Sequence, residues 1–154
     1  MTPTLIQYEQ PAYDLVKGLC ESARPSTVRK AEPGGWARQE LVLRKLGPKA
    51  WVRVSLFRNY FGPGWGENGK VLSPKALEAF FRFLERAAFP AESRSPSVFL
   101  TDRGGIEICW EDRSGKPVQV EFTGNGIEYY TAENEEAAVV GFEGLEQVCQ
   151  HLSV

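Results

Sequence analysis

The strongest constraint in this sequence is a series of short segments in residues 97–132 that alternate apolar and polar side chains. The segments are SVFLT, GIEICWE, PVQVEFT and GIEYYTA, and they are joined by DRGG, DRSGK and GNG. Alternation with a period of two indicates strands with one buried face, and Gly, Asp and Asn favour the backbone conformations of tight turns. The pattern therefore predicts an antiparallel meander.

The alternation also assigns side chains to the two faces of this meander. The apolar positions fall on the inner face: Ile106, Ile108, Trp110, Val118, Val120, Phe122, Ile127 and Tyr129. Acidic positions fall on the outer face: Glu107, Glu111, Glu121 and Glu128. A further short strand, AAVVGF, leads into a predicted helix over 143–152 that can cover the inner face. The outer face is either simply solvated, a mimic of a phosphate chain or a docking surface for a basic protein.

Two segments of the first half, WARQELVLRKL and WVRVSLFRNYF, predict a second antiparallel pair around the turn GPKA. Alternation places Val52, Val54 and Leu56 toward the core of this hairpin. Aromatic and basic side chains then share its outer face, namely Arg38, Arg44, Trp51, Arg53 and Phe57. The sequence thus predicts one sheet face that carries both rings and guanidinium groups.

Helices are predicted on either side of this hairpin. Residues 11–23 have apolar side chains at helical spacing, and Ser73 followed by Pro74 is a strong start signal for a helix through about Arg86. The core stripe of that second helix is Leu77, Phe80, Phe81 and Leu84, and a second apolar strip is Ala76, Ala79 and Phe83. Two strips indicate burial on two sides, either against the other half of the chain or against a second copy in a homodimer.

The Pro- and Ser-rich stretch FPAESRSPS, residues 89–97, divides the chain into halves of opposite charge. Residues 1–94 hold 15 Lys and Arg against 9 Asp and Glu, a net of +6, and residues 95–154 hold 3 against 11, a net of -8. We expect a basic module over 1–90 and an acidic module over 95–154. The predicted fold class is α+β, with two antiparallel sheets each followed by a covering helix, and an N-terminal helix.

The stretch GPGWGENGKV, residues 62–71, comes within one residue of the phosphate-binding loop pattern G-x-x-x-x-G-K-[ST]. Val71 stands where the magnesium-binding hydroxyl must be, and the next helix is predicted to begin only at Ser73 or Pro74. We therefore interpret the glycines as turn residues and not as a nucleotide site. Trp65 at the tip either stacks on a base or a partner, or returns to the core.

Residues 40–86 resemble the positive cofactor four family of transcriptional coactivators and its bacterial relatives. The similarity rests on FRNYF, the loop GPGWGEN and the segment GKVLSPKALEAFFRFL. Asn68 occupies the position of a family lysine, and Lys70 replaces an apolar residue of the family pattern. The resemblance implies a curved antiparallel sheet that binds single-stranded nucleic acid and a helix that forms a dimer.

Stacking on rings combined with basic side chains along a groove is how sequence-tolerant single-strand binding works. The residues expected to bind nucleic acid are Arg38, Arg44, Lys45, Lys49, Trp51, Arg53, Phe57, Arg58, Trp65 and Lys70. The alternative is that Trp51 and Phe57 pack against the first helix, with the basic side chains merely solvated.

Catalysis and metal binding are not expected. The single histidine, His151, lies close to the C-terminus, and Cys20, Cys109 and Cys149 are far apart, without the spacing of a zinc site. No cofactor is expected, and no apolar run is long enough to cross a membrane, so we expect a cytoplasmic protein.

The segments GGIEICWE and GNGIEYY also resemble small bacterial accessory proteins, including some from defence or toxin and antitoxin gene neighbourhoods. Two functions follow from these patterns. The first is an accessory protein that binds single-stranded nucleic acid through its basic half. The second is a protein-binding regulator, such as an inhibitor, an immunity or antitoxin-like protein or a complex-assembly factor. The residues expected to bind a partner are Phe83, Glu107, Glu111, Glu121 and Glu128.

Overall fold

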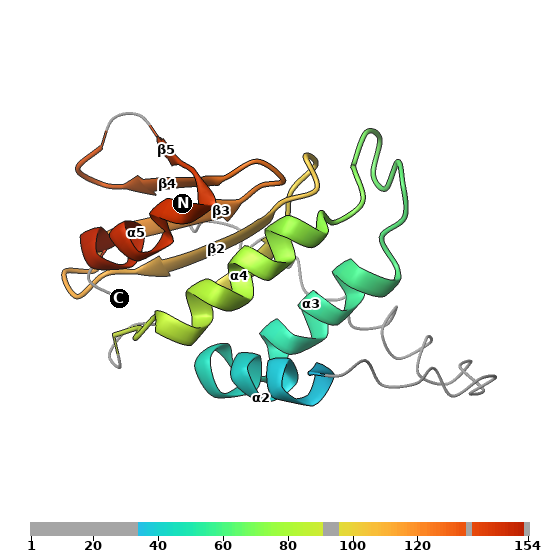
Figure 1. Ribbon diagram of the computed structural model, residues 1–154, viewed down its shortest axis with the longest axis horizontal. Coiled ribbons are helices and arrows are strands. Elements are labelled where there is room, and N and C mark those ends of the chain that lie inside the picture. Colours follow the sequence, from blue (N-terminus) through green and yellow to red (C-terminus); the bar gives the residue numbers. More distant parts are fainter. Residues whose placement is uncertain (1–33, 91–95, 135–136, 153–154) are drawn as a thin grey trace, which may run out of the picture. The chain divides into compact units, whose positions relative to one another are not determined.

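The computed structural model describes residues 34–90, 96–134 and 137–152, which belong to one compact unit. The helix predicted over 11–23 lies outside the described residues. The helices are α2 (Gly35–Leu46), α3 (Pro48–Asn59), α4 (Pro74–Arg86) and α5 (Leu145–Leu152), the last preceded by the 3-10 turn η1 (Phe142–Gly144). The strands are β1 (Ser97–Leu100), β2 (Ile106–Glu111), β3 (Pro117–Phe122), β4 (Ile127–Thr131) and β5 (Ala138–Val140) (Figure 1). None of the described helices is long and apolar enough to cross a membrane.

The strands form one antiparallel sheet in the order β1-β2-β3-β4-β5. Asp112 closes the turn between β2 and β3, because its Oδ1 accepts the backbone N–H groups of Ser114 at 2.8 Å and Lys116 at 2.9 Å. The inner-face side chains Ile106, Ile108, Trp110, Val118, Val120, Phe122 and Ile127 are all buried. The meander predicted from the alternation is therefore confirmed.

The predicted hairpin over residues 36–61 is wrong, because both of its segments are helices. The described residues hold a single five-stranded sheet, so the prediction of two sheets is wrong, although the fold is α+β overall. Ala50, Val54 and Phe57 lie at helical spacing and are the buried residues of α3. Gly47 ends α2 with a φ of +86°, and Pro48 occupies the first turn of α3. The Gly-Pro turn thus joins two helices instead of two strands.

The helix start predicted at residues 73–74 is confirmed, since Ser73 Oγ accepts the N–H of Ala76 at 3.4 Å. Both predicted apolar strips of α4 are buried. The ring of Phe83 lies 6.1 Å from that of Trp110 and 5.3 Å from that of Phe122, measured between centroids. On another flank α4 packs against α2. Residues 41–87 of the basic half and residues 98–152 of the acidic half therefore contribute to one hydrophobic core.

The described helices leave one side of the sheet open. Helices α4 and α5 lie on the same side of the strands, and α3 lies beside β1 at the edge (Figure 1). On the other side, Tyr130 and Val139 are exposed and no helix in the part of the chain that the structure describes covers them, whereas the Arg53 side chain of α3 lies over the ring of Phe99, which is 43% exposed. We call this side of the sheet the open face.

The loop that begins at Gly62 is tied to the turn between β1 and β2. Lys70 N donates to Asp102 O and Ser73 N donates to Gly104 O, both at 2.8 Å. Gly104 has a φ of +77°, and a Cβ placed on it would lie 2.4 Å from Val71 O. This glycine therefore serves both a left-handed turn and a close approach of two backbone segments.

Replacing Gly104 with alanine tests this junction, and Gly115→Ala is the matched control. Gly115 has the same φ of +77°, but nothing lies within 4 Å of its added Cβ. We expect Gly115→Ala to lower the free energy of unfolding by about 1 kcal/mol, the cost of a left-handed residue with a side chain. Gly104→Ala should cost clearly more because the loop must also move. Equal losses in urea unfolding would contradict the close approach.

Candidate functional site

The register of the sheet places three glutamates side by side on the open face. Phe99 pairs with Glu107, Glu107 with Glu121, Glu121 with Glu128, and Glu128 with Val139. These five residues form one row across all five strands, which we call the glutamate row. Phe99 and Val139, at its ends, are 43% and 69% exposed. The row therefore presents three carboxylates between two apolar side chains.

Such a row is an unfavourable arrangement in a free protein. Neighbouring strands lie about 4.8 Å apart, and like charges directly opposite each other destabilise a sheet. Glu107, Glu121 and Glu128 meet in two such pairs. A threonine or glutamine at these positions would suit a solvated face without the repulsion. Stability alone therefore does not explain three carboxylates in this row.

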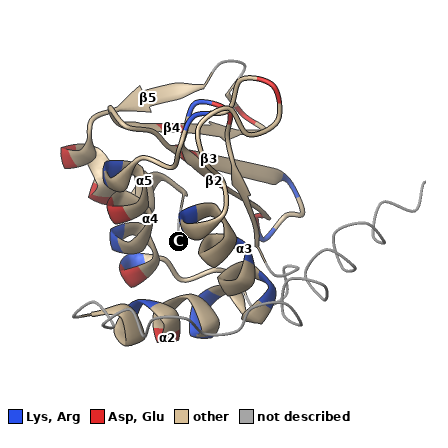
Figure 2. Cartoon of the chain, turned by 90° about the vertical axis from the view of Figure 1, so that its right-hand side faces the viewer, with Lys and Arg blue, Asp and Glu red and all other residues tan. Residues whose placement is uncertain are grey.

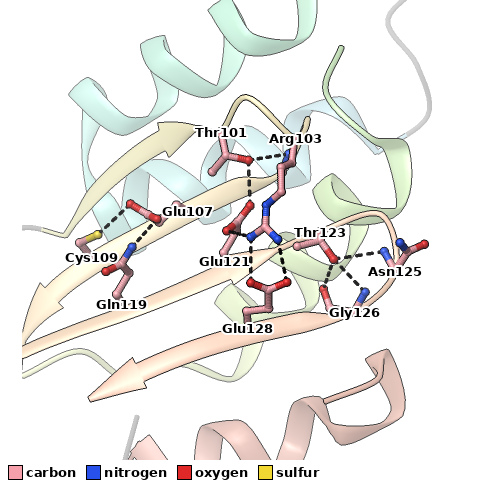
Figure 3. A network of polar contacts seen from close by, with 11 residues as sticks. Thr101, Arg103, Glu107, Cys109, Gln119, Glu121, Thr123, Asn125, Gly126 and Glu128 are labelled. Atoms are coloured by element: carbon pink, nitrogen blue, oxygen red, sulfur yellow. Dashed lines mark hydrogen bonds and ion pairs between the residues drawn. The ribbon is translucent and has the colours of Figure 1, made fainter. Parts of the chain in front are cut away.

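Arg103, in the turn between β1 and β2, offsets part of the repulsion (Figure 3). Its Nη1 donates to Glu128 Oε1 at 3.0 Å and its Nη2 to Glu128 Oε2 at 2.8 Å, and Nη2 also donates to Glu121. Thr101 Oγ1 donates to Glu121 Oε1 at 2.8 Å. The guanidinium thus bridges two carboxylates and holds them in fixed positions.

The remaining carboxylate, that of Glu107, is held by a neighbouring row. Gln119 Nε2 donates to one oxygen, and Cys109 Sγ donates to the other at 3.4 Å. Burial, followed by the nearby charge of Glu107, raises the pKa of Cys109 to about 12. The thiol is therefore protonated at neutral pH and acts as a hydrogen-bond donor, not as a nucleophile.

The ion pair with Arg103 favours the charged form of Glu128. The hydrogen bonds from Arg103 lower the pKa of Glu128, against the opposing effect of partial burial, and the same bonds raise the pKa of Arg103. Three carboxylates and one guanidinium carry a formal charge of -2. Arg103 is the more exposed partner in both ion pairs, with 52% of its side chain exposed, whereas the side chains of Glu121 and Glu128 are 12% and 28% exposed, so an approaching cation reaches the row most easily at Glu128.

A shallow hollow of about 250 Å³ lies on the open face beside the row. It is lined by Gln119, Glu121, Glu128, Tyr129, Tyr130 and Ala137. Glu121 and Glu128 contribute carboxylates to its lining, and the exposed ring of Tyr130 forms a further part of the lining. Carboxylates together with an aromatic ring are the surroundings that a Lys or Arg side chain prefers.

Two other hollows are lined by charged side chains of both signs, whereas the charged residues around the hollow on the open face are both acidic. One, of about 430 Å³, lies between α4 and the η1–α5 segment and includes Ala79, Phe142 and Leu145. Another, of about 450 Å³, lies near the turn between β2 and β3 and includes His151. Among the described residues, no group of three His, Cys, Asp or Glu side chains is arranged to hold a metal ion.

Several basic residues predicted to bind nucleic acid make contacts within the protein. Arg38 forms an ion pair with Glu78 at 2.5 Å, and its guanidinium lies 4.9 Å from the centre of the Phe81 ring. Lys45 Nζ donates to Ala87 O at 2.5 Å, next to the C-terminal end of α4. Arg53 Nη1 donates to Val98 O at 3.1 Å. These three side chains join α2 to α4 and α3 to β1.

The other predicted nucleic-acid residues do not form one stacking platform. Phe57 is buried and Trp51 is half-buried against the core. Arg44, Lys49, Arg58 and Lys70 are exposed, but they are spread over α2, α3 and the loop after α3. Figure 2 shows Lys and Arg distributed along the helices together with acidic residues.

Trp65 lies folded back onto its own loop. Its Nε1 donates to Lys70 O at 2.8 Å, and its ring meets Phe61 edge-on at 5.2 Å between centroids. A Cβ placed on Gly69 would lie 2.3 Å from the indole, so the ring rests directly on this glycine. In this structure Trp65 closes the loop and does not project from it.

The predicted partner-binding residues are only partly brought together. Glu107, Glu121 and Glu128 form the row, whereas Glu111 lies opposite Pro117, outside it. Phe83 is fully buried beneath the sheet, so it belongs to the core and not to a surface. Residues that the sequence analysis missed are Phe99, Arg103, Gln119, Tyr130 and Val139. Pairing the predicted strands in register would have identified Phe99 and Val139, but nothing in the local sequence marks Arg103.

No protein-family model matches the chain, and no curated protein sequence or solved structure is significantly similar to it. The resemblance of residues 40–86 to the positive cofactor four family stays a prediction. The resemblance implied a curved antiparallel sheet in this region, whereas the described residues from Gly35 to Leu46 and from Pro48 to Asn59 form helices.

Removal of Arg103 tests whether it stabilises the row. We expect Arg103→Gln to lower the free energy of unfolding by about 1 kcal/mol at neutral pH, because Glu121 and Glu128 then repel each other. The pKa of Glu128 is lowered in the folded protein, so this stabilisation exists above its unfolded pKa and is lost as the pH falls through the folded value. The cost of Arg103→Gln should therefore vanish in acid.

Two variants serve as controls for this experiment. Adding Glu128→Gln to Arg103→Gln should recover part of the lost stability, since the double variant no longer pairs two charges. Arg113→Gln, in the next turn, removes the same charge away from the row and should have little effect. A cost for Arg103→Gln that persists in acid would show that Arg103 does not act through these carboxylates.

Proposed function

We propose that the protein is a non-enzymatic, cytoplasmic regulator that binds a basic surface of another protein through the open face of its sheet. The observation that carries the proposal is the glutamate row, in which Glu107, Glu121 and Glu128 stand side by side between exposed Phe99 and Val139. The free thiols of Cys109 and Cys149 are compatible with a reducing compartment.

Energetics supports a binding role for the row. Repulsion between adjacent carboxylates costs stability in the free protein, and a cationic partner relieves that cost on binding. Residues kept at the expense of stability are typical of functional surfaces. The relief of repulsion adds to the direct attraction between the row and the partner.

The geometry of Arg103 indicates which chemistry fits the row. Its guanidinium already spans Glu121 and Glu128, and it contacts both oxygens of Glu128. The carboxylates are held by hydrogen bonds before any partner arrives, so little side-chain entropy remains to be lost on binding. An arginine or lysine from a partner can enter the hollow on the side of Tyr130.

The nucleic-acid alternative has less support in the arrangement of side chains. Its aromatic platform depended on strands that are helices, and Arg38, Lys45 and Arg53 make internal contacts. The open face would repel phosphates because of its three carboxylates. Binding of single-stranded DNA that is lost on Trp51→Ala or on Arg44→Ala would favour this alternative.

Neutralising the row tests the proposal with a defined probe, an unstructured peptide that carries several arginines. We expect the peptide to bind with an affinity that falls as salt is added, and Glu107→Gln combined with Glu128→Gln to weaken binding about tenfold or more. Isothermal titration calorimetry, repeated at low salt and at several higher salt concentrations, measures both effects.

The matched control for this titration is a double variant on the helix side, Glu85→Gln with Glu146→Gln. Both residues are exposed on helices, so the change in net charge is the same. We expect its affinity to remain close to that of the unchanged protein. Equal weakening by both double variants would mean that only net charge matters, and the proposed site would then be wrong.

A further inference from the structure

The two edges of the sheet differ in how they are protected. At the β1 edge, Arg53 of α3 donates to the Val98 carbonyl at 3.1 Å, and its guanidinium lies 5.3 Å from the centre of the Phe99 ring. At the other edge, β5 pairs with β4 and is the last strand of the sheet. Within the described residues no strand lies beyond β5. One edge is therefore capped by a helix and the other is not.

The composition of β5 adds to this difference. Natural proteins protect sheet edges with charged side chains, proline or bulges, because an unpaired edge can accept another strand. The segment Ala137–Phe142 reads AAVVGF and contains no charge and no proline. Val139 is 69% exposed on the open face, whereas Val140 packs toward Gly144 on the inner side. β5 has only three residues, and a short edge strand limits the number of hydrogen bonds that an added strand can form, but no charge or proline on this apolar edge prevents strand addition.

We propose that the β5 edge accepts an extended, basic segment of the partner protein as a sixth strand of the sheet. This inference rests on the proposed function and specifies how the partner lies on the open face. The added strand would extend the glutamate row by one position beyond Val139. Main-chain hydrogen bonds to β5 supply affinity, and side chains on the open-face side supply specificity.

The charge of the row determines the kind of segment. Side chains of a strand alternate between the two faces, so every second residue of the added strand points toward the open face. A long basic side chain beside Val139 lies two strand spacings, about 10 Å, from Glu128, a distance that an extended arginine and the glutamate can span together. The opposite side of the added strand continues the apolar inner face. The segment thus alternates basic and apolar residues.

A second copy of this chain fits the edge less well. Pairing β5 with its own copy would bring two glutamate rows, each with a formal charge of -2 after Arg103 is counted, into one continuous sheet. The carboxylates of the two rows would then repel each other across the shared edge, in addition to the repulsion within each row between Glu107, Glu121 and Glu128. Charge complementarity therefore favours a basic partner over a dimer through this edge.

Backbone methylation of a synthetic peptide separates strand addition from simple charge attraction. The probe is a peptide of alternating arginine and valine, made in three forms: unmodified, N-methylated on the arginine amides, and N-methylated on the valine amides. In an added strand, only one of the two amide sets faces β5. We expect one methylated form to lose at least about tenfold in affinity and the other to bind nearly as well as the unmodified peptide.

Protein variants provide the second half of the test. Val139→Lys and Phe99→Lys add the same charge at opposite ends of the glutamate row, so the change in the net charge of the row is the same, although Phe99 also lies beside Arg53. Val139→Lys should weaken the unmodified peptide at least about tenfold because it protects the free edge, and Phe99→Lys should do so only about twofold. Far-ultraviolet circular dichroism checks that both variants remain folded.

The outcomes distinguish the two proposals. Strand addition is wrong if the two methylated peptides bind equally well and if Val139→Lys and Phe99→Lys weaken binding by the same factor. The acidic docking face is still supported in that case, provided that Glu107→Gln with Glu128→Gln weakens binding. If the unmodified peptide does not bind at low salt, both proposals fail. A concentration-dependent dimer in sedimentation that Val139→Lys abolishes would show that the edge pairs with its own copy, which also overturns the inference.

Discussion

The aromatic side chains of α4 are the part of the structure on which the rest depends. Phe80 and Phe83 are fully buried against the sheet, where they meet Trp110 and Phe122, and Phe81 lies on the flank that faces α2. A helix buried on two flanks holds a sheet on one side and further helices on the other. Because α4 and α5 cover a single side of the strands, the open face exists as a consequence of this packing.

The same packing gives the open face its rigidity. Carboxylates on a flexible segment would move apart. Those on β2, β3 and β4 are held at strand spacing because the backbones of these strands are paired by hydrogen bonds. Arg103 and Gln119 then fix their orientations. The row therefore concentrates negative charge at a cost in stability, which the buried core on the inner side offsets.

The sequence predicted the second half of the fold well and the first half poorly, for a physical reason. In residues 97–132, alternation and turn chemistry indicate the same structure, and Asp112 and Gly115 both form the predicted turn. In residues 36–61, Val and Phe at alternate positions favoured strands, although Ala50, Val54 and Phe57 are also spaced for a helix. The packing of α3 against α2 and β1, and of α2 against α4, decided between these two periods, and local sequence does not contain that information.

The candidate site was predicted in part. Alternation alone placed Glu107, Glu121 and Glu128 on the outer face, but only the register of the strands shows that they are adjacent. Phe99 and Val139 belong to the site through that register as well. Arg103 reaches the row from a turn, and no periodicity marks such a residue. The basic residues of α2 and α3 resembled a binding surface because their contacts with α4 and β1 are tertiary.

The most direct test of the account is a map of the backbone amides that respond when an arginine-containing peptide is added, recorded by ¹⁵N-resolved nuclear magnetic resonance. The account predicts that the largest shift changes fall on β3, β4 and β5, with Glu121, Glu128 and Val139 among them. Changes that cluster on α2 and α3, or that are spread evenly over the surface, would contradict the claim that the glutamate row is the binding site.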